Sequence, residues 1–295
     1  MNKFLNLLAS NPDQYIGYGN PNADICFVGK EATGMLPLQC GLGSATYWMT
    51  SLPMFFDRIK TDNPNDSIWK EGHTWNKYQK LYDVIFPENA AKPGTMNFEQ
   101  HVFVTEMSAM PAATTAEGKG TSGFEGQLAL RKQKFFAHPY FKDFKVIVLA
   151  CSDYIVNFGD RREIDSLFEV TFDINGGAHE VGPQNAFWVH HSADGKRMVI
   201  HTRQLSGAVS DKLLEEMGAV IRQHLSGGHR DIAIEMPTPN KLRIGMSMDE
   251  CRNIWGNPLK ISKTTYSNNT ESEAWRYSNQ RLLIFENGVL HIINE

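Results

Sequence analysis

The sequence predicts an α/β protein, a three-layer α/β/α sandwich around a four-stranded parallel sheet, with a small α+β domain at the carboxyl end. Short apolar runs alternate with segments of helical periodicity over the first 225 residues, which is typical of a parallel sheet covered by helices. After Pro237-Thr238-Pro239, which is typical of a linker, runs of period two replace that alternation. We therefore expect a larger domain over 1–228, a linker over 229–240 and a smaller domain over 241–295.

Near-continuous apolar runs provide the parallel strands, as strands buried on both faces require. They cover residues 25–28, 102–106, 145–150 and 198–201. Two further strands are expected over 168–174 and 186–191, with Asn175-Gly176-Gly177 as the turn of a hairpin.

The helices of the larger domain follow from apolar residues spaced three and four apart. They are expected over residues 1–8, 47–59, 73–86, 125–137, 153–158 and 210–225. Thr74 and Ser152 are the residues expected to cap two of them, because a side-chain oxygen before the first turn accepts from a free backbone N–H.

The smaller domain begins with an expected helix over 248–255, with Ser247 as its cap and Glu250 at the capping-box position. Four strands follow, and Asn287-Gly288 is expected to be the tight turn between the last two. The strands are expected over 261–266, 273–277, 282–285 and 289–293. A domain this small buries little core, so we expect it to lean on a neighbour or a partner.

Composition excludes several classes of protein. The net charge of −4 disfavours binding through broad phosphate contacts, so a nucleic-acid role would need a local basic patch. The cysteines Cys26, Cys40, Cys151 and Cys251 are far apart with no C-x-x-C pair, so we expect no metal and no cofactor, and free thiols that suit a reducing cytoplasm. No stretch has the length of a membrane span and no secretory signal is found at the start, so we expect a cytoplasmic protein without membrane contact.

Two junctions between a strand and a loop organise the expected site. The strand over 198–201 ends at His201, and the strand over 25–28 runs into Lys30 and Glu31. Because ligands bind at the carboxyl edge of open α/β sheets, we expect His201 and Glu31 to face each other across one cleft.

Four segments resemble, in order, motifs of the uracil-DNA glycosylase superfamily, over about residues 15–225. They are the first strand with motif A (19–32), the strand that carries a base-reading Asn in the family (102–111), the following strand (145–150) and motif B, H-P-S-x-L-S (201–206). The resemblance implies a DNA glycosylase-like protein that hydrolyses the N-glycosidic bond of a damaged or unusual base in DNA.

On that resemblance, His201 would hydrogen-bond the departing base and Glu31 would orient water. Glu106 stands where the family has Asn, and Thr33 stands where motif A usually has Pro. An ionised carboxylate only accepts hydrogen bonds, so Glu106 could not read the O4 and N3–H edge of uracil, and we expect another base.

Other residues are expected to support base and phosphate binding. Tyr47 and Trp48 could stack on an extruded base, although Trp48 and Phe55 also have the spacing of a helix core. Candidates for phosphate contacts are Arg203, Lys196, Arg197 and Ser206. The adjacent His190 and His191 point to opposite faces of a strand, so they are not expected to share a metal.

Three alternatives remain open. His201 could be a structural hydrogen-bonding residue and Glu31 part of a solvated pair with Lys30. The chain could instead be a noncatalytic relative that binds a nucleotide or base, or a different hydrolase on the same architecture.

Residues 241–295 resemble the SmpA/OmlA-type domain of outer-membrane-assembly lipoproteins, which implies a module that binds a protein partner.

Overall fold

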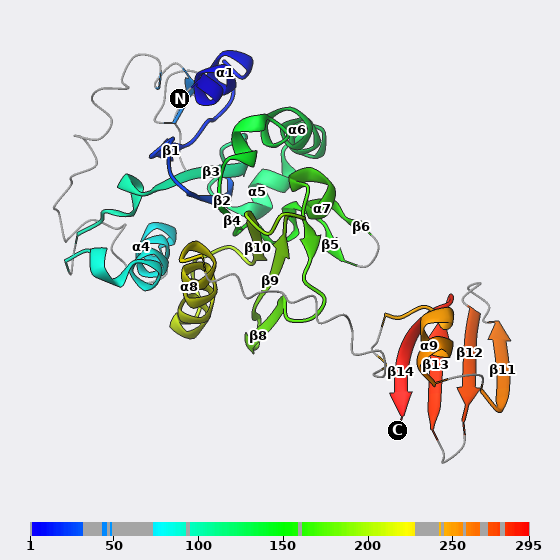
Figure 1. Ribbon diagram of the computed structural model, residues 1–295. Helices are drawn as coiled ribbons and strands as arrows, with labels where there is room; N and C mark the ends of the chain where they lie inside the picture. Colours follow the sequence, from blue (N-terminus) through cyan, green and yellow to red (C-terminus); the bar gives the residue numbers. More distant parts are fainter. Residues whose placement is uncertain are drawn as a thin grey trace. The chain divides into compact units, whose positions relative to one another are not determined.

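The computed structural model forms two compact units, residues Met1–Gly228 and His229–Glu295 (Figure 1). The structure describes residues 2–31, 43–45, 48, 73–92, 95–158, 161–227, 242, 245–255, 258–265, 271–277 and 281–294. The linker expected over 229–240 and, apart from Trp48, the helix expected over 47–59 lie outside these residues.

A mixed eight-stranded sheet forms the centre of the first unit, in the order β1-β3-β2-β4-β10-β9-β7, with β8 paired to β9. The four middle strands are parallel, and β1, β7, β8 and β9 are antiparallel additions at the two edges. The bounds are β1 (Tyr18–Gly19), β2 (Ile25–Glu31), β3 (Val102–Ser108), β4 (Val146–Leu149), β7 (Thr171–Phe172), β8 (Ala178–Gly182), β9 (Asn185–His191) and β10 (Met198–Thr202). The expected α/β class and the four parallel strands are confirmed, the sheet is extended by four antiparallel strands that were not part of the expected core, and the three-layer arrangement stays a prediction.

The register of the parallel strands fixes which residues lie beside one another near the carboxyl ends of the strands. Thr105, Val28, Leu149 and His201 lie side by side on β3, β2, β4 and β10. Residues in register on parallel strands point to the same face, and neighbours along a strand point to opposite faces. All seven residues of β2 are buried, as its apolar run predicts.

Helices flank the sheet in the first unit (Figure 1). They are α1 (Asn2–Ser10), α4 (Thr74–Ile85), α5 (Thr115–Gly120), α6 (Phe124–Arg131), α7 (Glu163–Phe168) and α8 (Asp211–Leu225), with a π-helical turn over Lys132–Phe136. None of the described helices is both long and apolar enough to cross a bilayer.

Two expected helix caps are wrong. His73, not Thr74, caps α4, because its Nδ1 accepts from the Trp75 N–H at 3.2 Å. Ser152 starts only a single 3₁₀ turn, Ser152–Tyr154, and a short strand pair, β5 (Asn157–Phe158) with β6 (Arg161–Arg162), replaces the expected helix. The expected strand over 168–174 shrinks to β7 because α7 takes its first residue.

The second unit packs α9 (Met248–Trp255) with a four-stranded antiparallel sheet. Its strands are β11 (Lys260–Thr265), β12 (Glu271–Arg276), β13 (Leu282–Glu286) and β14 (Val289–Asn294). Asn287 and Gly288 have φ of 47° and 83°, the positive values that a tight hairpin turn needs. The helix and the antiparallel sheet expected here are confirmed.

We expect opposite effects from adding one methyl group to two helical glycines. A Cβ on Gly218 of α8 would lie 2.5 Å from Val84 Cγ1 of α4, whereas a Cβ on Gly126 of α6 would meet nothing within 4 Å. Gly218→Ala should therefore lower the free energy of unfolding by about 1–3 kcal/mol through overpacking. Gly126→Ala should raise it by roughly 0.5–1 kcal/mol. Urea denaturation of both variants measures this, and a stabilised Gly218→Ala would contradict the close packing of α4 and α8.

Candidate functional site

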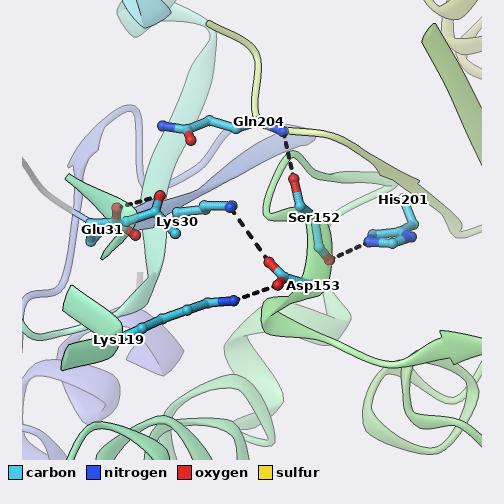
Figure 2. A network of polar contacts seen from close by, with 8 residues as sticks. Lys30, Glu31, Lys119, Ser152, Asp153, His201 and Gln204 are labelled. Atoms are coloured by element: carbon cyan, nitrogen blue, oxygen red, sulfur yellow. Dashed lines mark hydrogen bonds and ion pairs between the residues drawn. The ribbon is translucent and has the colours of Figure 1, made fainter. Parts of the chain in front are cut away.

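The turn after β4 joins the carboxyl ends of the neighbouring strands (Figure 2). Ser152 has a φ of 48°, which is uncommon outside glycine. Its carbonyl oxygen accepts from His201 Nε2 at 2.8 Å, and its hydroxyl accepts from the Gln204 N–H at 3.1 Å. On the other side of the turn, Asp153 accepts from Lys30 of β2 at 3.5 Å. The backbone of one turn therefore connects β2, β4 and β10.

His201 is buried, with 4% of its surface exposed, and both of its ring nitrogens have partners in the protein. A carbonyl can only accept, so Nε2 carries the proton that bonds Ser152. Nδ1 is then the acceptor for Asn157 Nδ2 at 3.3 Å. Burial holds the pKa of His201 below its usual value, with a smaller effect of the Ser152 hydrogen bond in the opposite direction. His201 is thus a neutral imidazole whose donor bonds the protein rather than a ligand.

Glu31 ends β2 and lies beside two hydroxyl groups. Its Oε1 accepts from Thr115 Oγ1 at 3.0 Å. Burial, and then a hydrogen bond to the Glu31 side chain, raise the pKa of Tyr154, so these two groups lie within reach of each other. Glu31 therefore places a carboxylate at the sheet edge, next to the hydroxyls of Thr115 and Tyr154.

Glu106 lies on β3 in a gap that Gly29 leaves open. A Cβ on Gly29 would lie 2.1 Å from Glu106 Oε2 and 3.1 Å from the Tyr78 hydroxyl, so only glycine leaves room for this carboxyl group. Burial first, and then the charge of Glu31, raise the pKa of Glu106 to about 8, with Arg131 opposing them. This pKa favours the protonated form of Glu106 at neutral pH, whereas the exclusion of uracil assumed the ionised form.

The hydroxyl groups beside Glu106 are short of partners. Tyr18 and Tyr78 are 3% and 1% exposed, and neither hydroxyl has a hydrogen-bond partner among the described residues. Buried polar groups are normally hydrogen-bonded, so unpaired ones point to a missing partner. These atoms and Glu106 form a polar group on the face of the sheet that α4 covers, since Tyr78 belongs to α4.

The expected meeting of His201 with the two carboxylates does not occur. His201 is level with Val28, so Glu31 lies three residues further along and two strands away, and the register puts their Cα atoms ~14 Å apart. His201 is in register with Thr105 and points to the same face as Thr105. Glu106 is the next residue of β3, so its side chain points to the opposite face. Glu31 and Glu106 share one face, and His201 belongs to the other.

Base stacking by Trp48 is contradicted by its burial. Its ring is fully buried, its Nε1 donates to the Gly17 carbonyl at 2.7 Å, and it packs edge-on against Phe4 at 5.0 Å. Trp48 is therefore a core residue, as the alternative interpretation of its spacing predicted. Tyr47, the other stacking candidate, lies outside the described residues.

The expected basic patch is divided between the two ends of β10. Lys196 and Arg197 precede the strand, so they lie at the end opposite His201. Arg197 donates to the carbonyls of Lys142 at 3.0 Å and Phe168 at 2.9 Å, which is a structural use. The candidates that follow His201 are Arg203, which donates to the Gln184 carbonyl, and the half-buried Ser206. Phosphate binding by these residues stays a prediction, but not at one shared patch.

Two lysines and Asp153 are site residues that the sequence did not reveal. Lys30 and Lys119 both bind the Asp153 carboxylate, from β2 and α5 (Figure 2).

Among the described residues no group of three metal-ligating side chains lies close enough together to hold an ion. The chain matches no protein-family model, and no curated protein matches it either. The basis for a function is thus the geometry of the sheet edge.

We expect Glu106→Gln to change how stability depends on pH. The pKa of Glu106 is raised in the folded protein, so the wild type loses stability relative to the variant as pH rises from about 4.5 to about 8. At pH 4 the two should be alike, and at pH 9 the variant should be more stable by about 5 kcal/mol. Thermal unfolding across this range, with the exposed Glu125→Gln as control, measures the difference. Parallel curves for wild type and Glu106→Gln would show that Glu106 is ionised.

Proposed function

We propose that the chain binds a nucleobase, free or within a nucleotide, at Glu106. The protonated carboxyl group carries the proposal. Its O–H donates and its C=O accepts, the same pair of roles that an asparagine amide provides. This pair matches a base edge on which a ring carbonyl stands beside a ring N–H, as in uracil and hypoxanthine. An ionised Glu106 could not donate to the O4 of uracil, but a protonated Glu106 can, so uracil is a possible ligand.

Three further observations support this site. Gly29 leaves space at the carboxyl group, and the hydroxyls of Tyr18 and Tyr78 beside it have no partner among the described residues. The site lies where parallel strands end, which is where ligands bind in open α/β sheets. The resemblance of residues 15–225 to the uracil-DNA glycosylase superfamily points the same way, since in that family this strand carries the base-reading side chain.

Hydrolysis of an N-glycosidic bond is the second candidate function. It is favoured by Glu31, whose carboxylate lies on the same face as Glu106 and could orient a water. His201 does not fit the catalytic role expected for it, because it points to the other face and bonds Ser152 and Asn157. In this proposal Glu31 and Glu106 act on the ligand, and His201 positions the turn after β4. Binding of a protein partner by residues 241–295 stays a proposal from the resemblance alone.

Base binding should follow the protonation of Glu106. Wild-type affinity for uracil or hypoxanthine should be constant up to about pH 7 and fall above about pH 8, where the carboxyl group loses its donor proton. Glu106→Gln keeps both hydrogen-bonding roles, so its affinity should not change across pH 6–9. Glu106→Leu should lose about tenfold or more. Isothermal titration calorimetry measures this, with 1,3-dimethyluracil, which has no ring N–H to donate, as the control ligand. Equal binding by Glu106→Leu would rule out this residue as the base reader.

Glycosylase activity is tested separately with oligonucleotides that contain uracil, hypoxanthine or xanthine, as single and double strands. Alkali cleaves the abasic sites that such an enzyme leaves. Glu31→Gln should abolish cleavage by removing the group that orients water, and His201→Gln should retain it to within a few fold. Loss of cleavage in His201→Gln with an unchanged melting temperature would return His201 to the catalytic role. Silence of the wild type on all substrates, with base binding intact, would identify a noncatalytic binding protein.

A further inference from the structure

Two lysines converge on one point at the carboxyl edge of the sheet. Lys30 Nζ lies 3.5 Å from one Asp153 oxygen, and Lys119 Nζ bonds the other. Both ammonium groups also lie over the ring of Tyr154, at 5.0 and 5.6 Å from its centroid. Figure 2 shows the two side chains reaching the same carboxylate from separate elements.

The contact that Lys30 makes with a negative charge is weaker than expected for an ammonium group that is so nearly buried. Its side chain is only 10% exposed. Its contact with Asp153 is longer than the 2.7–3.2 Å of ordinary N–H···O bonds, and an ammonium group has three hydrogens to donate. No other hydrogen-bond acceptor for Lys30 is found among the described residues. A nearly buried charge is costly unless it is paired, so Lys30 fits a site for a stronger anion than the one it now contacts.

Asp153 is free to leave this position. Its side chain is 60% exposed, and exposed ion pairs contribute little to stability. When the carboxylate turns into solvent, both ammonium groups remain near the point that it occupied. Glu31 does not block that point, because in Figure 2 it lies at the backbone end of the Lys30 side chain and Asp153 at the ammonium end.

We propose that Lys30 and Lys119 form an anion subsite for the phosphate of a nucleotide, and that Asp153 fills this subsite when no ligand is bound. Lys30 follows Gly29 on β2, so its side chain points to the face opposite Glu106, and a ligand with its base at Glu106 would carry its phosphate over the end of β2 to reach the lysines. The identity of the ligand rests on the proposed function. The subsite itself rests on the two lysines and Asp153.

Calorimetry at fixed ionic strength measures the affinity of the full chain for three probes. They are inorganic phosphate, uridine 5′-monophosphate and uridine. Asp153→Asn should bind the monophosphate and phosphate about tenfold more tightly than the wild type, because the competing carboxylate is gone. Asp143→Asn, which removes an exposed carboxylate paired with Lys3, should leave both affinities unchanged. A gain in affinity cannot come from misfolding.

The lysine variants supply the reverse effect. Lys30→Gln and Lys119→Gln should each weaken binding of the monophosphate by about tenfold and leave uridine unchanged, whereas the exposed Lys142→Gln should do neither. Equal affinity of wild type and Asp153→Asn for phosphate and for the monophosphate would overturn the subsite. Phosphate binding that responds to Asp153→Asn without any uridine binding would support the subsite and remove the proposed base site. If uridine binds and the monophosphate binds no more tightly than uridine, the base site is supported and the anion subsite is overturned.

Discussion

The hydrogen bond from His201 to the Ser152 carbonyl is the contact on which the sheet edge depends. β4 lies between β2 and β10 in the sheet. The turn that follows β4 must therefore fit between the ends of these two strands. Ser152 makes that turn in a left-handed conformation, and both its carbonyl and its hydroxyl are bonded from the β10 side. With Ser152 held in place, Asp153 and Tyr154 are presented to Lys30 and Lys119. A buried neutral imidazole suits this task, since it donates one bond and accepts another without a buried charge.

A second constraint comes from two carboxyl groups on one face of adjacent strands. Glu31 and Glu106 are both largely removed from water, and like charges at short range disfavour joint ionisation. Glu106 therefore keeps its proton, and Gly29 supplies the space that the neutral group occupies. In its protonated form Glu106 offers one hydrogen-bond donor and one acceptor. The unpaired hydroxyls of Tyr18 and Tyr78 extend this polar surface inside an otherwise apolar unit.

The two faces of the sheet separate two kinds of polar residue. On one face, His201, Thr105 and Arg131 are bonded to other parts of the protein and have structural roles. On the other face, the hydroxyls of Tyr18 and Tyr78 have no hydrogen-bond partner among the described residues, and Gly29 leaves space at the Glu106 carboxyl group. This contrast is the reason to assign binding to the carboxylates and support of the turn to His201.

Hydrophobic patterning was enough to predict the α/β class, the four parallel strands, α8, and the helix and antiparallel sheet of the second unit, because periodicity is a local property. It also indicated that the carboxyl edge holds the polar residues. The face on which each residue points was decided by register between strands distant in sequence, which is why His201 and Glu31 could not be placed by motif alone. The proton on Glu106 depends on burial and on a neighbour from another strand, and the pairing of Lys30 and Lys119 with Asp153 joins three distant segments. Such effects arise only when the chain is folded, because they depend on distance in space rather than along the sequence.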